Sequence, residues 1–191
     1  MLYFIARVIL IPFIYLLFWP KVKGKENLPL EGSAIIYANH TSVLDPILLG
    51  CLLPRKIYFM AKQELFKFPP AGTVLKLLGA FPVKRGTADI TAIKTALRTL
   101  REGNVFGIFP EGTRSKSGNL QNFTHGIAAI AHKSRAVAVP VKISGGYKLF
   151  HSIQVTIGKP LDFKQYYGKK SSSELLDRIS EEMSEAVKSL A

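Results

Sequence analysis

Two short apolar runs, Ser33–Ala38 and Val105–Phe109, each have the length of a buried strand, and each leads directly into a polar motif. The first motif is Asn39–Asp45 (NHTSVLD) and the second is Phe109–Ser115 (FPEGTRS). In an open α/β sheet, ligands bind just beyond the carboxyl ends of the parallel strands. If both runs lie parallel in one sheet, the two motifs meet at a single edge.

Further strand-like runs alternate with helix-like segments, which predicts an α/β fold with a mixed, mostly parallel sheet flanked by helices. Strands are predicted at 57–61, 80–83, 136–143 and 153–157, and helices at 45–52, 63–78, 89–101, 126–133 and 173–190. Pro140 suggests that the run 136–143 is an edge strand or is bulged, because proline cannot donate to a ladder. Asp45 is expected to cap the helix that follows it. In the helix 89–101, the apolar face is predicted to carry Ile90, Ile93, Leu97 and Leu100.

The first 20 residues differ from the rest in their hydropathy. Up to Trp19 the only charged residue is Arg7, and a helix of about 18 residues spans a length near the lower limit for crossing a hydrocarbon core. Pro12 is expected to kink this helix or to divide it. We predict a membrane-anchoring segment over 1–20 and a folded domain over 21–191. The sequence leaves open whether the segment spans the bilayer or lies in one leaflet.

A cleaved signal peptide fits this segment poorly, because no basic region precedes the apolar run and no small-residue cleavage site follows it. Lys21, Lys23 and Lys25 come after the run instead, which predicts that the domain lies on the cytoplasmic face of a membrane, the inner membrane if the source is bacterial. The single cysteine, Cys51, excludes an internal disulfide and is expected to be a buried apolar residue on a helix.

The charge balance favours a membrane surface as the partner. The chain has 26 Lys and Arg against 13 Asp and Glu, a formal net charge of +13, and its mean hydropathy is positive at +0.18. A basic and apolar protein suits an anionic lipid surface. Nucleic acid is disfavoured because the aromatic residues are not interleaved with the basic ones as a stacking platform requires.

The first motif carries residues suited to base catalysis. Neutral imidazole is the usual general base near pH 7, and it needs a partner that orients the ring and stabilises the imidazolium. His40 is followed across a turn by Asp45, a spacing that can bring the carboxylate back onto the ring. The alternative is that His40 only packs and Asp45 only caps a helix; the polar cluster at a strand end favours catalysis. No metal is predicted, because further ligands are absent at a usual spacing.

The second motif carries residues suited to holding a phosphate. Arg114 can bind phosphate in a bidentate manner, and Gly112 permits a close backbone approach. Glu111 is unfavourable beside a phosphate unless it orders Arg114 or a hydroxyl group. Another cationic pair, Lys84 and Arg85, also follows a predicted strand. A plain turn is the alternative for this motif.

Together these motifs resemble those of the lysophosphatidate (glycerophospholipid) acyltransferase family, from about Lys23 to Lys159. Asn39–Asp45 is similar to its catalytic NHxxxxD block, Gly79–Gly86 to the second block and Phe109–Ser115 to the third. Val139–Val141 is similar to the fourth, a hydrophobic element near the acyl donor.

The resemblance implies transfer of an acyl group from acyl-carrier protein or coenzyme A to the sn-2 hydroxyl of 1-acylglycerol-3-phosphate, which gives phosphatidic acid. His40 is then the base and Asp45 its partner, and the acyl thioester is a co-substrate, with no cofactor. The implied acceptor-binding residues are Lys84, Arg85, Glu111, Gly112, Thr113 and Arg114.

Two alternatives stay open at this point. One is an acyltransferase that acts on another lysolipid or on glycerol-3-phosphate. The other is a non-catalytic module that binds anionic lipids, for which neither His40 nor Asp45 is needed. Of the remaining histidines, His125 could line the pocket near the third block, although a local hydrogen bond is favoured, whereas His132 is expected on a helix surface and His151 in a loop.

Overall fold

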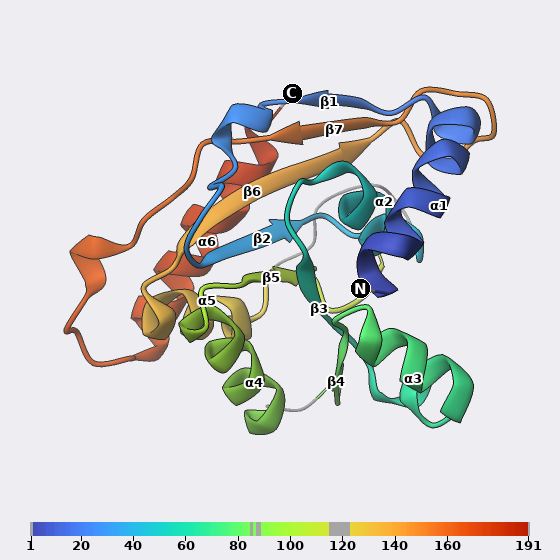
Figure 1. The fold of residues 1–191 in the computed structure, drawn as a ribbon. Coiled ribbons are helices and arrows are strands. Elements are labelled where there is room, and N and C mark those ends of the chain that lie inside the picture. Colours follow the sequence, from blue (N-terminus) through green and yellow to red (C-terminus); the bar gives the residue numbers. More distant parts are fainter. Residues whose placement is uncertain (1, 85, 87–88, 115–122, 191) are drawn as a thin grey trace.

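The central feature of the fold is a seven-stranded sheet with the order β1-β7-β6-β2-β5-β3-β4, shown in a computed structural model (Figure 1). The structure describes residues 2–84, 86, 89–114 and 123–190. The strands are β1 (Lys21–Lys23), β2 (Ala34–Ala38), β3 (Ile57–Lys62), β4 (Phe81–Val83), β5 (Val105–Ile108), β6 (Val137–Ser144) and β7 (Gln154–Ile157). Every adjacent pair is parallel except β6 and β7, which confirms the predicted mixed, mostly parallel sheet.

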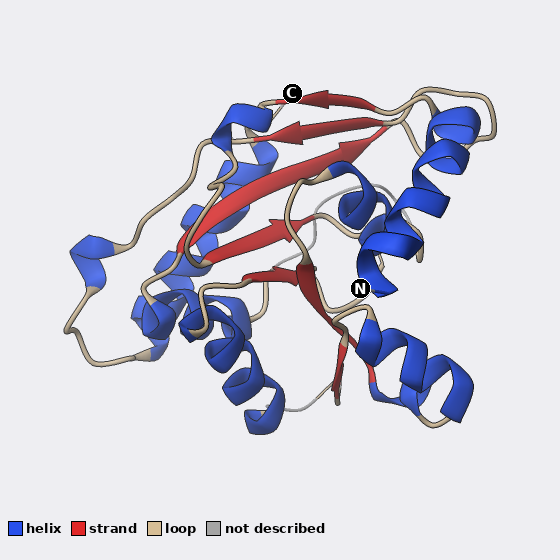
Figure 2. Ribbon diagram, in the orientation of Figure 1, coloured by secondary structure: helices blue, strands red, loops and turns tan. Residues whose placement is uncertain are grey.

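Helices cover both faces of this sheet (Figure 2). The α-helices are α1 (Leu2–Phe18), α2 (Asp45–Leu52), α3 (Pro69–Leu77), α4 (Ile90–Arg101), α5 (His125–Ser134) and α6 (Ser173–Lys188), and the 3₁₀ turns are η1 (Lys25–Asn27), η2 (Gln63–Phe66) and η3 (Lys164–Tyr166). Alternate residues of β2 point to opposite faces: Ile36 packs with α1 and α2, and Ile35 packs with α4, α5 and α6. The protein is therefore a three-layer α/β sandwich.

The central strands place both polar motifs at one edge of the sheet. β2 lies between β5 and β6 and runs parallel to both, and all residues of β2 are buried. The loops that follow β2 and β5 therefore leave the sheet side by side, as the sequence predicted. The loop that follows β6 leaves at this same edge.

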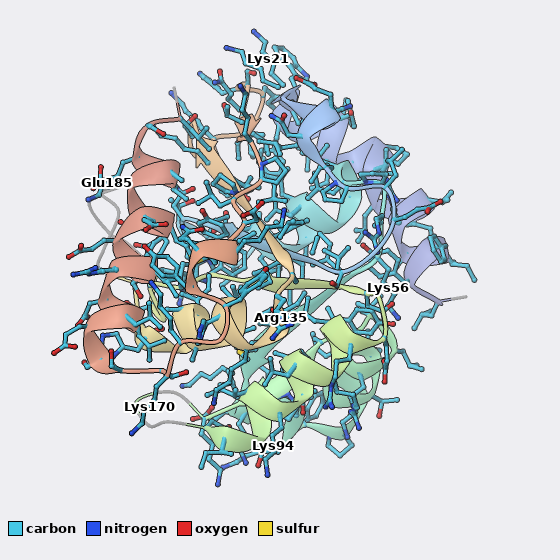
Figure 3. All side chains as sticks on the ribbon, turned by 90° about the vertical axis from the view of Figure 1, so that its left-hand side faces the viewer. Lys21, Lys56, Lys94, Arg135, Lys170 and Glu185 are labelled. Atoms are coloured by element: carbon cyan, nitrogen blue, oxygen red, sulfur yellow. The ribbon has the colours of Figure 1, made fainter. Side chains whose placement is uncertain are left out.

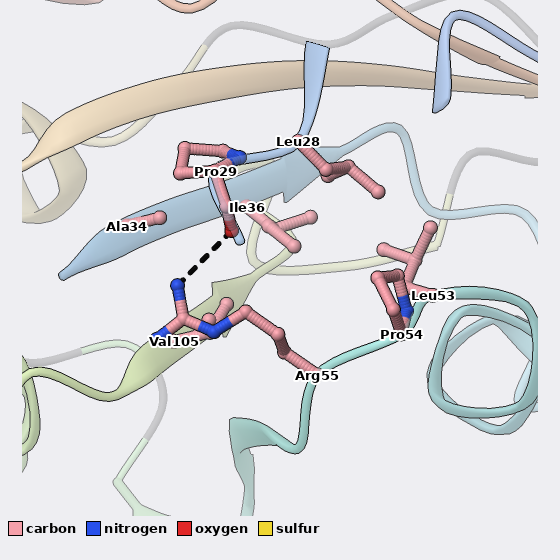
Figure 4. A pocket seen from close by; sticks show the side chains of 8 residues that line it. All are labelled: Leu28, Pro29, Ala34, Ile36, Leu53, Pro54, Arg55 and Val105. Carbon is pink, nitrogen blue, oxygen red and sulfur yellow. Dashed lines mark hydrogen bonds between the residues drawn. The ribbon is translucent and has the colours of Figure 1, made fainter. Parts of the chain in front are cut away.

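The opposite edge of the sheet is held by Arg55, in the segment between α2 and β3. Its guanidinium donates hydrogen bonds to the carbonyl oxygens of Pro29 (3.1 Å), Gly32 (2.6 Å) and Gly103 (2.8 Å). Figure 4 shows this side chain beside a cavity of about 10 Å³, which is too small for a substrate. Arg55 thus ties together loops at the amino ends of the strands and leaves the carboxyl edge for chemistry.

α1 packs along the molecule rather than projecting from it. Tyr3, Ile14 and Phe18 are buried, and the Tyr3 hydroxyl donates to the Gly50 carbonyl of α2 (3.2 Å). The helix runs unbroken through Pro12, so the expected division at this proline is wrong. No helix in the described part of the chain combines the length and the apolar character needed to cross a bilayer.

Pro140 lies in an interior strand, so the predicted edge position is wrong. β6 pairs with β2 on one side and with β7 on the other. The Pro140 carbonyl accepts from the amide of Gly158, just past the end of β7 (2.9 Å). In a strand, the N–H and C=O groups of one residue point to the same side, so an N–H at residue 140 would also face Gly158. The donor that proline lacks is therefore missing at the end of the β6–β7 ladder and not within it.

The predicted apolar face of α4 is confirmed for Leu100, which is buried, and for Ile93 and Leu97, which pack against the core, but not for Ile90. Ile90 is 64% exposed, whereas Ala92, Ala96 and Leu100 are buried. The helix is turned so that its small residues face the sheet, and Ile90 in its first turn lies outside the contact.

Charged side chains are spread widely over the surface. In Figure 3, Lys21, Lys94 and Lys170 project outward from different elements, and Glu185 projects from α6. These three lysines are therefore well separated from one another in this view.

Candidate active site

The Nδ1 atom of His40 lies 2.8 Å from Oδ2 of Asp45. Both residues are buried, and Asp45 has no exposed surface. His40 is in the loop that follows β2, and Asp45 is the first residue of α2. The predicted contact across this turn is therefore present.

The Asp45 carboxylate is held by several donors. Its Oδ2 also accepts from the amides of Thr41 (2.7 Å) and Ser42 (2.8 Å), so it closes the turn that precedes α2 instead of capping the helix. Leu44 is the N-cap residue, which corrects the capping role expected for Asp45. An oxygen that accepts from two amides also accepts from the ring, which assigns the proton to Nδ1 of His40 and a lone pair to Nε2.

The two motifs make direct contact. The amide of His40 donates to Oε1 of Glu111 (2.8 Å), whose side chain is buried. Glu111 thus joins the loop after β2 to the loop after β5. Glu111 therefore binds the backbone of His40 at the edge of the sheet, a contact that the sequence did not reveal.

Aromatic stacking fixes the plane of the His40 ring. The ring stacks on Phe109 with a centroid distance of 4.2 Å, and Phe109 stacks on Phe59 of β3 at 5.7 Å. A Cβ atom on Gly107 of β5 would lie 2.4 Å from Phe59. Glycine at position 107 therefore makes room for the stack that supports the imidazole.

Asn39 fixes the start of the same loop. Its side-chain amide donates to the carbonyl of Ile143 (2.9 Å), and its Oδ1 accepts from the amide of Ile143 (2.8 Å). This pair of bonds continues the β2–β6 ladder beyond Ala38 by means of a side chain. The loop that carries His40 is therefore anchored to β6 before the histidine is reached.

Tyr147 is a member of the site that the sequence analysis missed. Its hydroxyl donates to Oδ1 of Asp45 (2.7 Å). Burial, together with the adjacent Asp45 carboxylate, raises the pKa of Tyr147, so the hydroxyl keeps its proton and acts as a donor. Tyr147 follows β6, whose carboxyl end lies at the same edge as those of β2 and β5, but this pairing is a tertiary feature that the local sequence pattern does not reveal.

A cavity of about 660 Å³ opens beside this cluster. Phe109 and Glu111 line it, so it adjoins His40 through the two residues that the histidine contacts, although His40 is not itself a lining residue. Its polar lining includes the predicted acceptor-binding residues Lys84, Glu111, Gly112 and Thr113, and its apolar lining includes Met60, Val83, Ile93, Ile108, Ile130 and Leu176. Such a lining suits a ligand with one polar and one apolar part.

Only one of the two predicted phosphate-binding arginines lies within the described residues. Arg114 is exposed and is not one of the described lining residues. Arg85 lies outside the described residues. The cationic group that the structure does place at the cavity is Lys84, after β4.

Of the remaining histidines, His151 lies exposed in a loop, as predicted, whereas His132 is not exposed. His125 lines the cavity, and its Nε2 lies 2.6 Å from Oδ1 of Asp177 on α6, a long-range contact rather than a local one. His132 is buried, with its ring nitrogens against the Tyr166 carbonyl (2.9 Å) and the Ser171 hydroxyl (3.1 Å), so its predicted surface position is wrong. Among the residues that the structure describes, no group of three or more His, Cys, Asp or Glu side chains is arranged to hold a metal ion.

Comparison with known proteins identifies the family to which this chain belongs. A family model described as Acyltransferase matches residues 20–144, more than half of the chain. The chain belongs to this acyltransferase family. The match contains both motifs, the cavity residues Lys84 and Glu111 to Thr113, and β6.

Relatives that carry a more specific name cover most of this acyltransferase. A protein of Bacillus subtilis (strain 168) named 1-acyl-sn-glycerol-3-phosphate acyltransferase is 36% identical over 176 residues, which is 89% of this chain and 87% of that protein. The chloroplastic 1-acyl-sn-glycerol-3-phosphate acyltransferase LPAT1 of Arabidopsis thaliana is 29% identical over 95% of this chain, but the match spans only 54% of that protein.

A solved structure shares the fold. The crystal structure of the 1-acyl-sn-glycerophosphate (LPA) acyltransferase PlsC from Thermotoga maritima matches with a TM-score of 0.73 and 27% identity, covering 97% of this chain and 77% of that one. The α/β sandwich described above is therefore shared with an acyltransferase of known structure.

Proposed function

We propose that this acyltransferase moves a fatty acyl group from a thioester to the sn-2 hydroxyl of 1-acyl-sn-glycerol-3-phosphate and so forms phosphatidic acid. The observation that carries the proposal is the 2.8 Å contact between His40 and the buried Asp45. An anionic-lipid-binding module has no use for a histidine whose tautomer is fixed by a buried carboxylate. The names of the relatives support the choice of acceptor.

In the proposed mechanism, the oxygen of the sn-2 hydroxyl bonds to the thioester carbonyl carbon while Nε2 of His40 accepts the hydroxyl proton. The imidazolium that forms is stabilised by Asp45, which contacts Nδ1. When the tetrahedral intermediate collapses, the C–S bond breaks and the imidazolium gives its proton to the departing thiolate. His40 is then neutral again, and no covalent acyl-enzyme is needed.

The acceptor is proposed to occupy the cavity beside the dyad. Lys84 and the loop at Gly112 and Thr113 line its polar part and are placed to receive a phosphate, while Met60, Ile93 and Leu176 suit an acyl chain. Arg85 and Arg114 remain proposed phosphate ligands on the strength of the motifs alone. The donor is proposed to be acyl-carrier protein or coenzyme A, and no cofactor is required for the transfer.

Membrane association is proposed to depend on the segment 1–20, with 21–191 as the acyltransferase domain. The outer face of α1 exposes large apolar side chains, among them Val8 (71%), Phe13 (57%) and Leu16 (62%), while its inner face packs on the domain. Its 17 residues make about 25 Å of helix, shorter than a hydrocarbon core. These features support a helix lying in one leaflet, on the cytoplasmic side.

An acyl-transfer assay on the detergent-solubilised protein tests the function. Labelled 1-oleoyl-glycerol-3-phosphate is supplied with palmitoyl-coenzyme A or palmitoyl-acyl-carrier protein, and the His40→Ala variant is run in parallel. We expect phosphatidic acid from the wild type and a loss of about 100-fold or more in the variant.

Each other outcome has a distinct meaning. No product with either donor, from protein shown to be folded, contradicts the acceptor assignment and directs the search to other lysolipids or glycerol-3-phosphate. If His40→Ala still forms phosphatidic acid at the wild-type rate, His40 is not the base, although the proposed reaction stands. A difference between the two donors identifies the natural one.

A further inference from the structure

The buried Asp45 carboxylate is contacted from a part of the chain far from both motifs. Its Oδ2 faces the His40 ring, and its Oδ1 accepts from the Tyr147 hydroxyl (2.7 Å). Among the described residues, the only other donor to Oδ1 is the Thr41 hydroxyl at 3.4 Å, which is too long for a strong bond. The hydroxyl of Tyr147 is therefore the main contact that fixes the rotation of the carboxylate from the side away from the ring.

The loop that carries Tyr147 has a backbone shaped for this approach. It follows β6 with Gly145 and Gly146 at φ +93° and +69°. A Cβ atom on Gly145 would lie 2.7 Å from the carbonyl oxygen of Ser152, so a side chain at that position would push the two arms of the loop apart. The turn thus directs Tyr147 back toward the carboxyl edge of the sheet.

The far arm of the same loop is fastened to the last turn of α1. The amide of Phe150 donates to the carbonyl of Leu17 (2.7 Å), and the amide of Ile153 donates to the carbonyl of Phe18 (2.9 Å). The ring of Phe18 meets the Tyr147 ring edge to face at 5.4 Å, and Phe18 is buried. The end of α1 therefore contacts both the backbone of the loop and the ring that carries the hydroxyl.

These contacts form one continuous path from Phe18 through Tyr147 to Asp45 and His40. We infer that Tyr147 is a positioning residue for the Asp45–His40 dyad and that the end of α1 sets its place. The inference rests on the proposed function, since it takes Asp45 as the partner of the base. α1 also carries the exposed apolar face that is proposed to lie in the lipid. The same helix therefore contacts, through Tyr147, the Asp45 carboxylate that orients the base.

The experiment compares Tyr147→Phe with Tyr167→Phe, which makes the same chemical change elsewhere. The Tyr167 hydroxyl donates to the Arg135 carbonyl (3.1 Å), away from the dyad. We expect Tyr147→Phe to lower kcat about tenfold with little change in KM, because Tyr147 is not among the described residues that line the proposed acceptor cavity, whereas an unsupported carboxylate misorients the base. Tyr167→Phe is expected to keep the wild-type kcat.

The pH profile of kcat separates positioning from a general loss of structure. His40 is faced by the carboxylates of Asp45 and Glu111 and, through Asp45, by the Tyr147 hydroxyl. A hydroxyl that donates to Asp45 withdraws part of its negative charge. Without it, the charge that Asp45 presents to the ring changes, so the acidic limb of the pH profile of kcat is expected to shift in Tyr147→Phe relative to the wild type. A smaller folded fraction would lower kcat without moving this limb, and that result overturns the inference.

A double-variant cycle tests the link to α1. Phe18→Leu keeps an apolar side chain in the core but removes the ring that contacts Tyr147. If Phe18 acts through Tyr147, its effect on kcat largely disappears in the Tyr147→Phe background. Fully additive losses overturn the part of the inference that concerns α1.

A spectroscopic measurement keeps the inference separate from the proposed function. The Nδ1 proton of His40, observed by NMR in the wild type, should shift in Tyr147→Phe and not in Tyr167→Phe, whether or not any substrate is turned over. A shift in a protein that forms no phosphatidic acid contradicts the proposed function and leaves the positioning role intact. An unshifted resonance together with unchanged kcat overturns the role of Tyr147.

Discussion

The amide nitrogen of His40 donates a 2.8 Å hydrogen bond to the buried Oε1 of Glu111, and this bond joins the two polar motifs. The acidic residue of the second motif therefore holds the backbone of the histidine, in addition to lining the cavity. One side chain thus connects the position of the base with the wall of the proposed acceptor site.

This bond predicts a difference between two substitutions of Glu111. Glu111→Gln keeps an oxygen that accepts from the His40 amide, whereas Glu111→Ala leaves that buried N–H unpaired, at a cost of about 1–3 kcal/mol. We expect Glu111→Ala to lower the free energy of unfolding by that amount and to reduce kcat, with Glu111→Gln much closer to the wild type in stability. Denaturant titrations check this, and equal stability of the two variants would show that the bond contributes little.

The donors around Asp45 predict a large effect of Asp45→Asn. The carboxylate accepts from the His40 ring, two amides and the Tyr147 hydroxyl. An asparagine offers one oxygen and a donating NH₂ group, which must face at least one of these donors or turn the ring to the wrong tautomer. We expect kcat to fall by about 10²–10⁴-fold, measured in the acyl-transfer assay. Activity within threefold of the wild type would rule out Asp45 as the partner of the base.

The aromatic stack under His40 predicts that Gly107→Ala is harmful. The new Cβ would meet the Phe59 ring at 2.4 Å, and Phe59 supports Phe109, which supports the imidazole. We expect a loss of about 1–3 kcal/mol of stability from overpacking and a lower kcat from a displaced ring. Phe59→Leu combined with Gly107→Ala should recover part of the stability, because it removes the clashing ring atoms. No recovery would mean that the other close contact of the new Cβ, 2.6 Å from Cγ2 of Ile57, carries most of the strain.

We predict that Asp89 makes a pH-dependent contribution to the free energy of unfolding. Its carboxylate accepts from the amides of Lys84 (2.9 Å) and Ala92 (3.0 Å), as the N-cap of α4, and these bonds lower the pKa of Asp89. Because the pKa of Asp89 is lower in the folded protein than in the unfolded chain, where it is about 3.9, the ionised carboxylate stabilises the fold above that pH. This contribution is lost as the pH falls through the pKa of Asp89 in the folded protein.

Asp89→Ala should therefore lower the free energy of unfolding by about 1 kcal/mol at pH 7, with a smaller difference from the wild type near pH 3. Thermal or denaturant melts at the two pH values measure this. A difference that is the same at both would show that the charge of Asp89 plays no part.

The sequence was sufficient where chemistry follows directly from a strand end. The apolar run before His40 fixes β2, and the short spacing to Asp45 brings the carboxylate back to the ring across one turn. The parallel pairing of β2 with β5 then follows from the alternation of strands and helices. These features depend on local pattern and on a general rule of parallel sheets.

The sequence was insufficient where a role depends on neighbours in space. Tyr147 acts on Asp45 because β6 pairs with β2, and no local pattern reveals that pairing. Pro140 is tolerated inside the sheet because β7 ends beside it, which depends on the length of another strand. His132 is buried because the segment around Tyr166 packs over α5. In each case the tertiary contact outweighs the local preference.

The exposed face of α1 predicts a test of membrane binding. Val8 and Phe13 are 71% and 57% exposed, so polar residues there should not disturb the core. The double substitution Val8→Ser, Phe13→Ser removes apolar area that would otherwise leave water on contact with lipid. We expect binding to vesicles that contain anionic lipid to weaken at least tenfold, measured by co-sedimentation, with an unchanged melting transition.

Leu30→Ser is the matched control for this variant, because Leu30 is 75% exposed but lies outside α1, in the segment before β2. The control should bind vesicles like the wild type if the apolar face of α1 is the element that enters the lipid. Equal weakening in both would indicate that general surface hydropathy governs binding. Full binding by the α1 variant would contradict the anchoring role, and the basic residues that follow the helix, Lys21 and Lys23, would then be the next candidates.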